Sequence, residues 1–267
     1  MMDKRGMEKR KSSPPSFFHR VYSVWYRHIR VYNKHLISNG FPPFLEPLFF
    51  IAGIGLGLGN YVGLIGDTPY LSFLAAGMLA PPAMFTAAFE CTFGTFIRLE
   101  FDKAYDGMVS SSLTVSDLFI GEMLFAGTKG LFFSFAVLTI FMIFGLIPSK
   151  MGLLTPLIGF LSGLMFAALA LFVTSFVKTI NHFNFFLTGC LTPMFFFSGV
   201  IFPITNLPYP VQIGSEIFPL THSTRIIRAC CLDALHWSLL WDLLYIIVFT
   251  IIIGWLAISR LRKRLIQ

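Results

Sequence analysis

Charged residues are scarce in this 267-residue chain. Asp, Glu, Lys and Arg together make up 12% of it, whereas hydrophobic residues make up 55%. A typical soluble domain carries about 25% charged residues, which help to cover its apolar core. So few charges exclude a soluble globule of this size, and so much apolar sequence excludes an intrinsically disordered chain. The sequence therefore predicts an all-α membrane protein that crosses the bilayer several times.

Cysteine is also rare, and the motifs of common enzymes are missing. The spacing of Cys91, Cys190, Cys230 and Cys231 fits neither a zinc site nor a redox pair, so we expect free thiols. The sequence contains neither GxSxG nor HExxH. The segment GEMLFAGTK at 121–129 has the wrong order for a phosphate-binding loop. We therefore expect no catalytic residue, no metal site and no cofactor bound by this chain.

The sparse intramembrane charge bears on the source of energy for transport. Carriers coupled to ions usually bury acidic or basic residues inside their spans. The candidates here, Glu46, Glu90, Glu122, Lys129 and Asp242, all fall near the ends of predicted spans. This favours energy supplied from outside the chain. A proton-coupled carrier and a membrane-embedded transferase stay open as alternatives; the transferase would need a His or carboxylate cluster at one membrane face.

Apolar runs of about 20 residues are long enough to cross a bilayer, and six regions of the sequence qualify. They lie at 44–64, 70–93, 119–146, 153–176, 183–202 and 237–258. The pair Pro81-Pro82 predicts a kink in the second span. Lys and Arg concentrate towards both ends of the chain, so the positive-inside rule places both termini in the cytoplasm, which requires an even number of spans.

The segments around the spans complete the predicted organisation. Residues 1–16 are basic and contain Pro and Ser, which predicts a disordered tail. Residues 17–43 mix aromatic and basic side chains and predict an amphipathic helix in the headgroup layer, with an ordinary surface helix as the alternative. Residues 44–259 form the predicted six-span domain, and 260–267 form a basic cytoplasmic tail. The Pro-rich segment 203–222 predicts a re-entrant pair of short helices on the outer side.

Two further patterns suggest contacts. The polar stretch 94–118 is predicted to be a cytoplasmic loop whose short amphipathic helix inserts Tyr105 and Met108 into a groove of a soluble partner. An ordinary solvated loop is the alternative. In the first span, Gly53 and Gly57 have the spacing that allows two helices to approach closely, within one subunit or between two.

Four stretches of sequence, taken together and in this order, resemble the ABC-2 type permeases of ABC exporters. The resemblance is closest to the nodulation-factor (lipo-oligosaccharide) export permeases of the NodJ type. The stretches are FLEPLFFIAGIGLGLGNYVG at 44–63, FECTFGTFIRLEFDKAYDGMVSSSLTVSDLFIGE at 89–122, FFFSGVIFPITNLP at 195–208 and FPLTHSTRIIRA at 218–229.

This resemblance implies a transport subunit without an ATPase site of its own. Two copies of the chain would pair with two separate ATPase subunits, which hold the ATP and Mg²⁺, in a bacterial inner membrane. The substrate would be amphiphilic or a glycan: a lipo-oligosaccharide, a polysaccharide or a lipid-linked glycan. The resemblance also implies a connecting helix at 17–38 and a coupling helix at 98–116. The residues expected to couple to the ATPase are Arg98, Asp102, Tyr105, Asp106, Met108 and Glu122.

Two more sets of residues are candidates for handling substrate. Phe197 and Phe202 flank a predicted helix break and can contact sugar faces or acyl chains. Arg225 and Arg228 can attract anionic headgroups or anchor to lipid phosphates. The expected path consists of Gly53, Gly57, Phe197, Ser198, Gly199 and Phe202. The expected outer re-entrant segment is represented by Pro203, Pro208, Pro219, His222 and Arg225.

Overall fold

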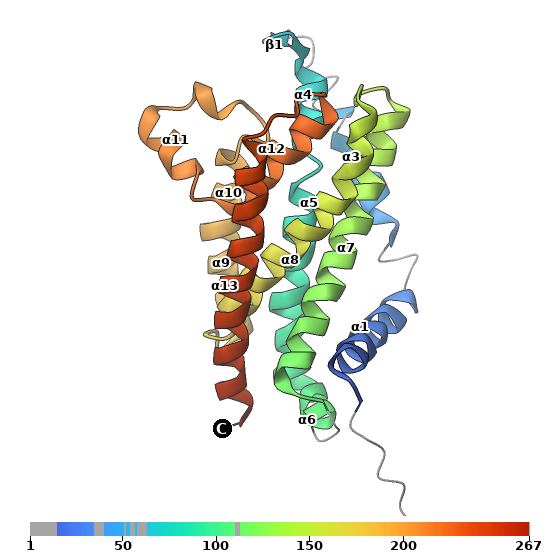
Figure 1. Cartoon of the computed structure of the whole chain (residues 1–267), viewed down its shortest axis with the longest axis vertical. Coiled ribbons are helices and arrows are strands. Elements are labelled where there is room, and N and C mark those ends of the chain that lie inside the picture. Colours follow the sequence, from blue (N-terminus) through green and yellow to red (C-terminus); the bar gives the residue numbers. More distant parts are fainter. Residues whose placement is uncertain are drawn as a thin grey trace, which may run out of the picture.

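The computed structural model describes residues 15–34, 40–50, 52–53, 57, 63–109 and 113–266. These residues form an elongated helical bundle (Figure 1). In the described part, the strands are confined to a small hairpin in which β1 (Leu64–Ile65) pairs antiparallel with β2 (Thr68–Pro69). The hairpin lies at the end of the bundle opposite the C terminus (Figure 1).

Four helices of the described chain are long and apolar enough to cross a membrane: Tyr70–Phe101, Val115–Ile143, Lys150–Thr174 and Leu239–Leu265. They correspond to the second, third, fourth and sixth predicted spans. The last of them turns large apolar side chains outward, as expected of a helix that faces lipid: Trp241 and Trp255 are 75% and 67% exposed. The structure thus confirms a helical protein with several membrane-spanning segments.

The other two predicted spans are only partly represented. Most of 44–64 lies outside the described residues, which include α3 (Pro42–Phe50). The fifth is a continuous helical run of α9 (Phe183–Phe186), η6 (Leu187–Leu191) and α10 (Thr192–Phe197). It ends before Ser198 and is shorter than the predicted 183–202. The count of six spans therefore stays a prediction.

The second predicted span is interrupted near its prolines, as expected, but it continues further than predicted. α4 (Tyr70–Gly77) ends before α5 (Pro81–Phe89), with turn residues between them. Two wide π-helical turns then extend the helix, η2 (Glu90–Gly94) and η3 (Ile97–Phe101). The prediction of a cytoplasmic loop from residue 94 is therefore wrong up to Phe101, because the polar residues there bond to neighbouring helices.

The core lies between α5, α7 (Val115–Ile143), α8 (Thr155–Thr174) and α13 (Leu239–Ile266). A capping box at Thr114 and Asp117 starts α7. Glycines let α7 and α8 approach closely: a Cβ at Gly130 would lie 2.6 Å from the carbonyl oxygen of Gly159. The remaining short elements at the two ends are α6 (Ala104–Val109), η4 (Lys150–Leu154) and η5 (Ile180–His182).

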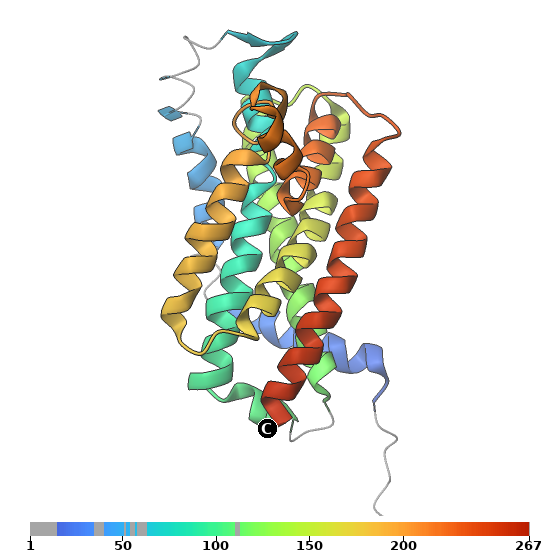
Figure 2. The same ribbon diagram turned by 90° about the vertical axis from the view of Figure 1, so that its left-hand side faces the viewer.

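The amphipathic segment forms α1 (Phe17–Asn33), which crosses the bundle near the end that holds the C terminus (Figure 2). It buries Val21, Val24 and His28, while Phe18 and Tyr22 are exposed. Arg20 fastens it to α7, because its Nε donates a 2.7 Å hydrogen bond to Asp117 Oδ2. Phe18 and Tyr22 thus point away from the bundle, whereas Trp25 faces α7 and donates a 3.0 Å hydrogen bond from its indole Nε1 to Thr128 Oγ1.

The Pro-rich segment forms short broken helices at the opposite end of the molecule (Figure 1). They are η7 (Ile204–Asn206) and α11 (Tyr209–Ser215), followed by α12 (Pro219–Cys231), which packs against α4, α8 and α13. The broken helical character is as predicted. Its re-entry into the membrane stays a prediction.

Candidate functional site

A buried set of polar side chains joins α1, the helix 70–101, α6 and α7. We call it the inner polar cluster. It consists of His28, Glu90, Thr95, Arg98, Tyr105, Glu122 and Lys129. Because these side chains come from four elements, the cluster ties together the parts of the chain at one end of the bundle.

Two carboxylates and two cations alternate through the cluster. Arg98 donates from Nε to Glu122 Oε1 at 3.0 Å and from an Nη to Glu90 Oε1 at 2.8 Å. Lys129 Nζ donates to Glu90 Oε2 at 2.9 Å. Formal charge within the quartet sums to zero, so each buried ion has a partner. An arrangement of this kind is rigid, since displacing one member leaves another charge uncompensated.

Glu122 is the hub of the cluster and is 1% exposed. Besides Arg98, it accepts hydrogen bonds from Thr95 Oγ1 at 2.8 Å and from the Tyr105 hydroxyl. Lys129, two turns further along α7, joins the same cluster through Glu90. Glu122 thus connects α7 both to the spanning helix and to α6.

Tyr105 does not lie where the sequence suggests. It is fully buried, packs edge-on against Phe119, and donates to Glu122. Burial, and the nearby Glu122 charge, raise the pKa of the Tyr105 phenol well above its usual range, so it remains a neutral donor. The expectation that Tyr105 is an exposed aromatic side chain is wrong. Its hydroxyl instead pairs with the carboxylate of Glu122, which lies 17 positions later in the sequence.

The acidic and basic residues that the helix 70–101 contributes to the cluster lie in its π-helical turns. Glu90 opens η2 and Arg98 lies within η3. A π-turn holds one residue more than an α-turn and is frequent at functional sites. The wider turns coincide with the residues that reach across to α7, so the local irregularity serves the cluster.

His28 closes the cluster from α1. Its ring stacks on Phe125, with centroids 5.2 Å apart, and its buried Nε2 lacks a hydrogen-bond partner while lying 3.7 Å from Glu122 Oε1. Burial lowers the pKa of His28 from 6.5 to about 4, although the Glu122 charge opposes this. The charged groups that act on the ring are Glu122, Arg98, Glu90 and Arg27. At neutral pH the imidazole is therefore uncharged.

We predict that the chain loses stability in mild acid because of His28. Above pH 6.5 the ring is neutral in both states; below it, the unfolded chain binds a proton that the folded chain excludes. The free energy of unfolding should fall by up to about 3 kcal/mol between pH 6.5 and 4. Thermal unfolding of the detergent-solubilised chain at several pH values measures this. His28→Gln should show a smaller acid-induced decrease, and an equal decrease in both proteins would contradict the assignment.

The remaining residues expected to couple to an ATPase lie around the turn between η3 and α6. Asp102 is exposed at this turn, and Met108 is half-buried against the core; the side chain of Asp106 lies outside the described residues. Arg98 belongs to the spanning helix rather than to a separate coupling helix.

The sequence does not identify His28 as a member of the cluster, because a lone histidine among aromatic and basic residues carries no signal of its distant partners.

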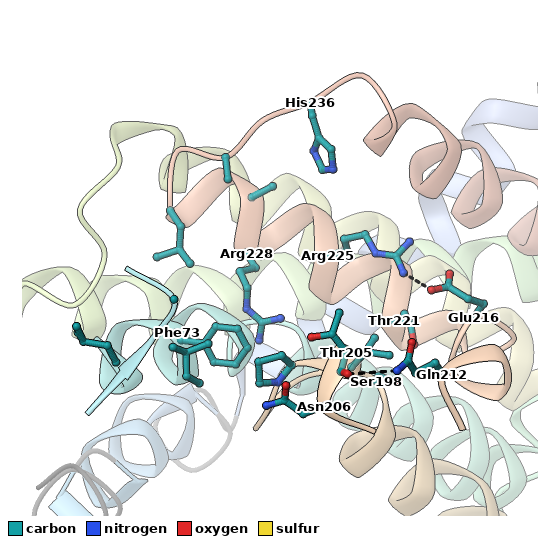
Figure 3. A pocket seen from close by; sticks show the side chains of 18 residues that line it. Phe73, Ser198, Thr205, Asn206, Gln212, Glu216, Thr221, Arg225, Arg228 and His236 are labelled. Atoms are coloured by element: carbon teal, nitrogen blue, oxygen red, sulfur yellow. Dashed lines mark hydrogen bonds and ion pairs between the residues drawn. The ribbon is translucent and has the colours of Figure 1, made fainter. Parts of the chain in front are cut away.

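A cavity of about 820 Å³ opens at the other end of the bundle, beside the hairpin and α12 (Figure 3). We call it the outer cavity. Four of the sequence-predicted residues line it: Ser198, Pro203, Arg225 and Arg228. Other residues predicted for the path or the outer segment do not line this cavity. Phe197 and Pro208 are exposed, and Pro219 is buried at the start of α12. Gly199 adopts φ +74° where the helix breaks. Gly53 and Gly57 are exposed, and a Cβ at either meets no described atom within 4 Å.

His222 and Arg225 form a second ion-pair group that fastens α12 to α13. His222 Nδ1 lies 2.6 Å and an Arg225 Nη 2.8 Å from the same Asp242 oxygen. Arg225 also donates to Glu216 Oε1 at 2.5 Å (Figure 3), and Tyr245 stacks on the imidazole at 3.8 Å. Both carboxylates near Arg225 are thus engaged with it.

Comparisons with known proteins agree with this architecture. Residues 19–232 match the ABC-2 type transporter family. The chain is 35% identical over 253 residues to Nodulation protein J of Sinorhizobium fredii, covering 92% of this chain and 94% of that protein. It is 31% identical over 259 residues to Nodulation protein J of Bradyrhizobium diazoefficiens, with the same coverage. It is also 21% identical over 200 residues to the inner membrane transport permease YadH of Escherichia coli, covering 75% and 78%. This multi-pass membrane protein belongs to the ABC-2 type transporter family.

Proposed function

We propose that this chain is the permease of an ATP-driven exporter and moves an amphiphilic or glycan substrate out of a bacterial cell. A separate ATPase supplies the energy, with its own ATP and Mg²⁺, and a second copy of the chain completes the path. The observation that carries the proposal is the alignment to Nodulation protein J, which runs over 92% of this chain and 94% of that relative. The cargo class follows the resemblance to lipo-oligosaccharide permeases, with polysaccharides and lipid-linked glycans in the same class.

The distribution of charge supports one orientation in the inner membrane. Basic side chains gather at the end that holds the C terminus, where Lys178, Arg260, Lys263 and Arg264 line a cavity of about 560 Å³ together with Glu100. Segments rich in Lys and Arg stay on the cytoplasmic side of bacterial membranes. We therefore place the inner polar cluster towards the cytoplasm and the outer cavity on the far side.

The inner polar cluster supplies a route for the work of the ATPase. Phe101 is 67% exposed at the end of the helix 70–101, and Asp102 and Lys103 are exposed beside it. An ATPase that presses on this turn displaces η3 and α6 together. Arg98 and Tyr105 both bond to Glu122, so the displacement reaches α7 through buried, directional contacts. α1 follows, because Arg20 binds Asp117.

The outer cavity suits the exit of an amphiphile. Apolar side chains such as Ile65 and Ile204 share its wall with polar ones such as Thr205 and Gln212. Cavities of about 300–1,000 Å³ accommodate drug-sized groups, so this one is large enough for a headgroup or a few sugar units. Phe197, 38% exposed at the end of α10, lies next to the cavity-lining Ser198.

Reconstitution in vesicles tests the proposal. The purified chain alone should not accumulate a labelled lipo-oligosaccharide, whereas the chain reconstituted with its ATPase should do so only with ATP. As a matched control, an ATPase variant that binds ATP without hydrolysing it should abolish accumulation. Uphill transport by the chain alone, driven by a pH gradient, would instead establish a proton-coupled carrier. Chemical modification of the glycan without its movement would establish a transferase.

A further inference from the structure

The outer cavity contains an arginine without a carboxylate partner. Arg225 and Arg228 lie one turn apart on α12, and both line the cavity (Figure 3). Arg225 binds Asp242 and Glu216. Among the residues that the structure describes, no carboxylate lies within 4.0 Å of the Arg228 guanidinium, the limit for an ion pair. Two neighbouring arginines thus differ sharply in how their charge is balanced.

Arg228 is nevertheless held firmly in place. One Nη donates to the carbonyl oxygens of Gly199 and Val200 at 2.6 and 3.2 Å, and the guanidinium carbon stacks 3.8 Å above the ring of Phe73. Gly77 leaves the space that this requires, since a Cβ there would overlap both the Val200 carbonyl and the guanidinium. Carbonyls and a ring face stabilise a cation, but they do not cancel its charge.

Two residues that line the outer cavity carry donors without a partner. The buried Nε of Arg228 and the hydroxyl of Ser198 have no hydrogen-bond partner, and Ser198 is 1% exposed. Ser198 lines the cavity directly before Gly199, whose carbonyl binds Arg228. Buried polar groups without partners are rare in proteins and call for an explanation. A guanidinium and a hydroxyl together suit an anionic oxygen, which accepts from both.

We infer that the outer cavity binds the phosphate or similar oxyanion of an amphiphile's headgroup, with Arg228 as the cation that recognises it. This inference rests on the proposed function, because it takes an amphiphile to pass through or reside in the cavity. The mixed wall favours an amphiphile over a soluble anion, because apolar side chains come from the hairpin, α4, η7 and the residue after α12. They include Leu64, Ile65, Phe73, Ile204 and Leu232.

Three probes separate the contributions of phosphate and acyl chain. The full chain, purified in dodecyl maltoside, is titrated with lysophosphatidic acid, with the matching monoacylglycerol, which lacks the phosphate, and with inorganic phosphate. We expect lysophosphatidic acid to bind at least about tenfold more tightly than either of the others, since a charged hydrogen-bonded pair contributes on that scale. Arg228→Gln should remove this preference.

A second variant leaves the supports of Arg228 untouched. Asn206 is exposed and lines the cavity, so Asn206→Asp adds one negative charge with almost no change of shape. This variant should weaken the binding of lysophosphatidic acid about tenfold and leave the affinity for monoacylglycerol unchanged. Asn206→Ala is the matched control and should bind as the unmodified chain does. Unfolding temperatures of all variants verify that each is folded.

Three results would overturn the inference. They are equal affinity for lysophosphatidic acid and monoacylglycerol, equal affinity for inorganic phosphate and lysophosphatidic acid, and unchanged binding by both charge variants. The binding measurement needs no ATPase. If lysophosphatidic acid does not bind but ATP-driven transport is intact, only this inference is refuted. If lysophosphatidic acid binds but ATP-driven transport fails, only the proposed function is refuted.

Discussion

Arg98→Gln is expected to lower the free energy of unfolding by about 3–5 kcal/mol, because it breaks a buried ion pair from one side. Arg98 is the cation that bonds to Glu122, whose other two donors, Thr95 and Tyr105, are neutral. Lys129 is bonded to Glu90 and does not replace it. The variant therefore leaves a carboxylate in the interior without its counter-ion. Thermal unfolding in detergent should show a midpoint lower by about 10 °C.

Two variants make this prediction specific. Adding Glu122→Gln to Arg98→Gln removes the unpaired charge, so the double variant should be more stable than Arg98→Gln alone. Glu100→Gln is the matched surface control: Glu100 is 44% exposed, and its pair with Arg264 should contribute no more than about 1 kcal/mol. If Arg98→Gln and Glu100→Gln have equal effects, the inner polar cluster is not a stabilising unit.

The same double variant separates stability from coupling. The uncharged pair can hold the helices together, but it loses the strong directional contacts between η3 and α7. We expect it to assemble with the ATPase and to hydrolyse ATP while transport falls. Stability and coupling both depend on Glu122, so only the double variant distinguishes them.

Much of the fold can be predicted from sequence because hydrophobic length is a local property. Four predicted spans are present, and the chain breaks near Pro81-Pro82 as the missing backbone N–H groups require. The helix end at Phe101 is harder to predict, because the polar residues of its last turns suggest a loop and their partners, such as Glu122 for Arg98, lie on another helix. Pairings over 24 positions of sequence leave no periodic signature.

The sites show the same limit. Sequence places Arg225 and Arg228 together as two basic residues near the outer side, and nothing in their spacing tells them apart. The structure does, because Asp242 of α13 reaches Arg225 and not Arg228. Similarly, Gly53 and Gly57 have the same four-residue spacing as Gly159 and Gly163. A Cβ at Gly159 or Gly163 would meet the backbone of α7, whereas a Cβ at Gly53 or Gly57 meets no described atom within 4 Å, so the spacing alone does not identify the close contact.

A substitution at the contact between α7 and α8 is expected to have the second large effect on stability. Gly159→Val is expected to cost at least about 3 kcal/mol, because its side chain has no space. A Cβ at residue 159 would overlap the Ser134 side chain and lie 3.0 Å from the carbonyl oxygen of Gly130. Backbone cannot move aside as a flexible side chain can, so α7 and α8 must separate. One turn further along α8, a Cβ at Gly163 would lie 2.9 Å from the Gly127 Cα, so the two helices touch along a stripe.

A matched substitution isolates the packing contribution. Gly214 is also helical, in α11, and a Cβ there meets nothing within 4 Å. Gly214→Val should therefore change stability by no more than about 0.5 kcal/mol, since valine is no worse a helix former than glycine. The midpoint of thermal unfolding in dodecyl maltoside, measured for both variants, compares them directly. Equal midpoints would mean that close backbone contact does not hold α7 and α8 together.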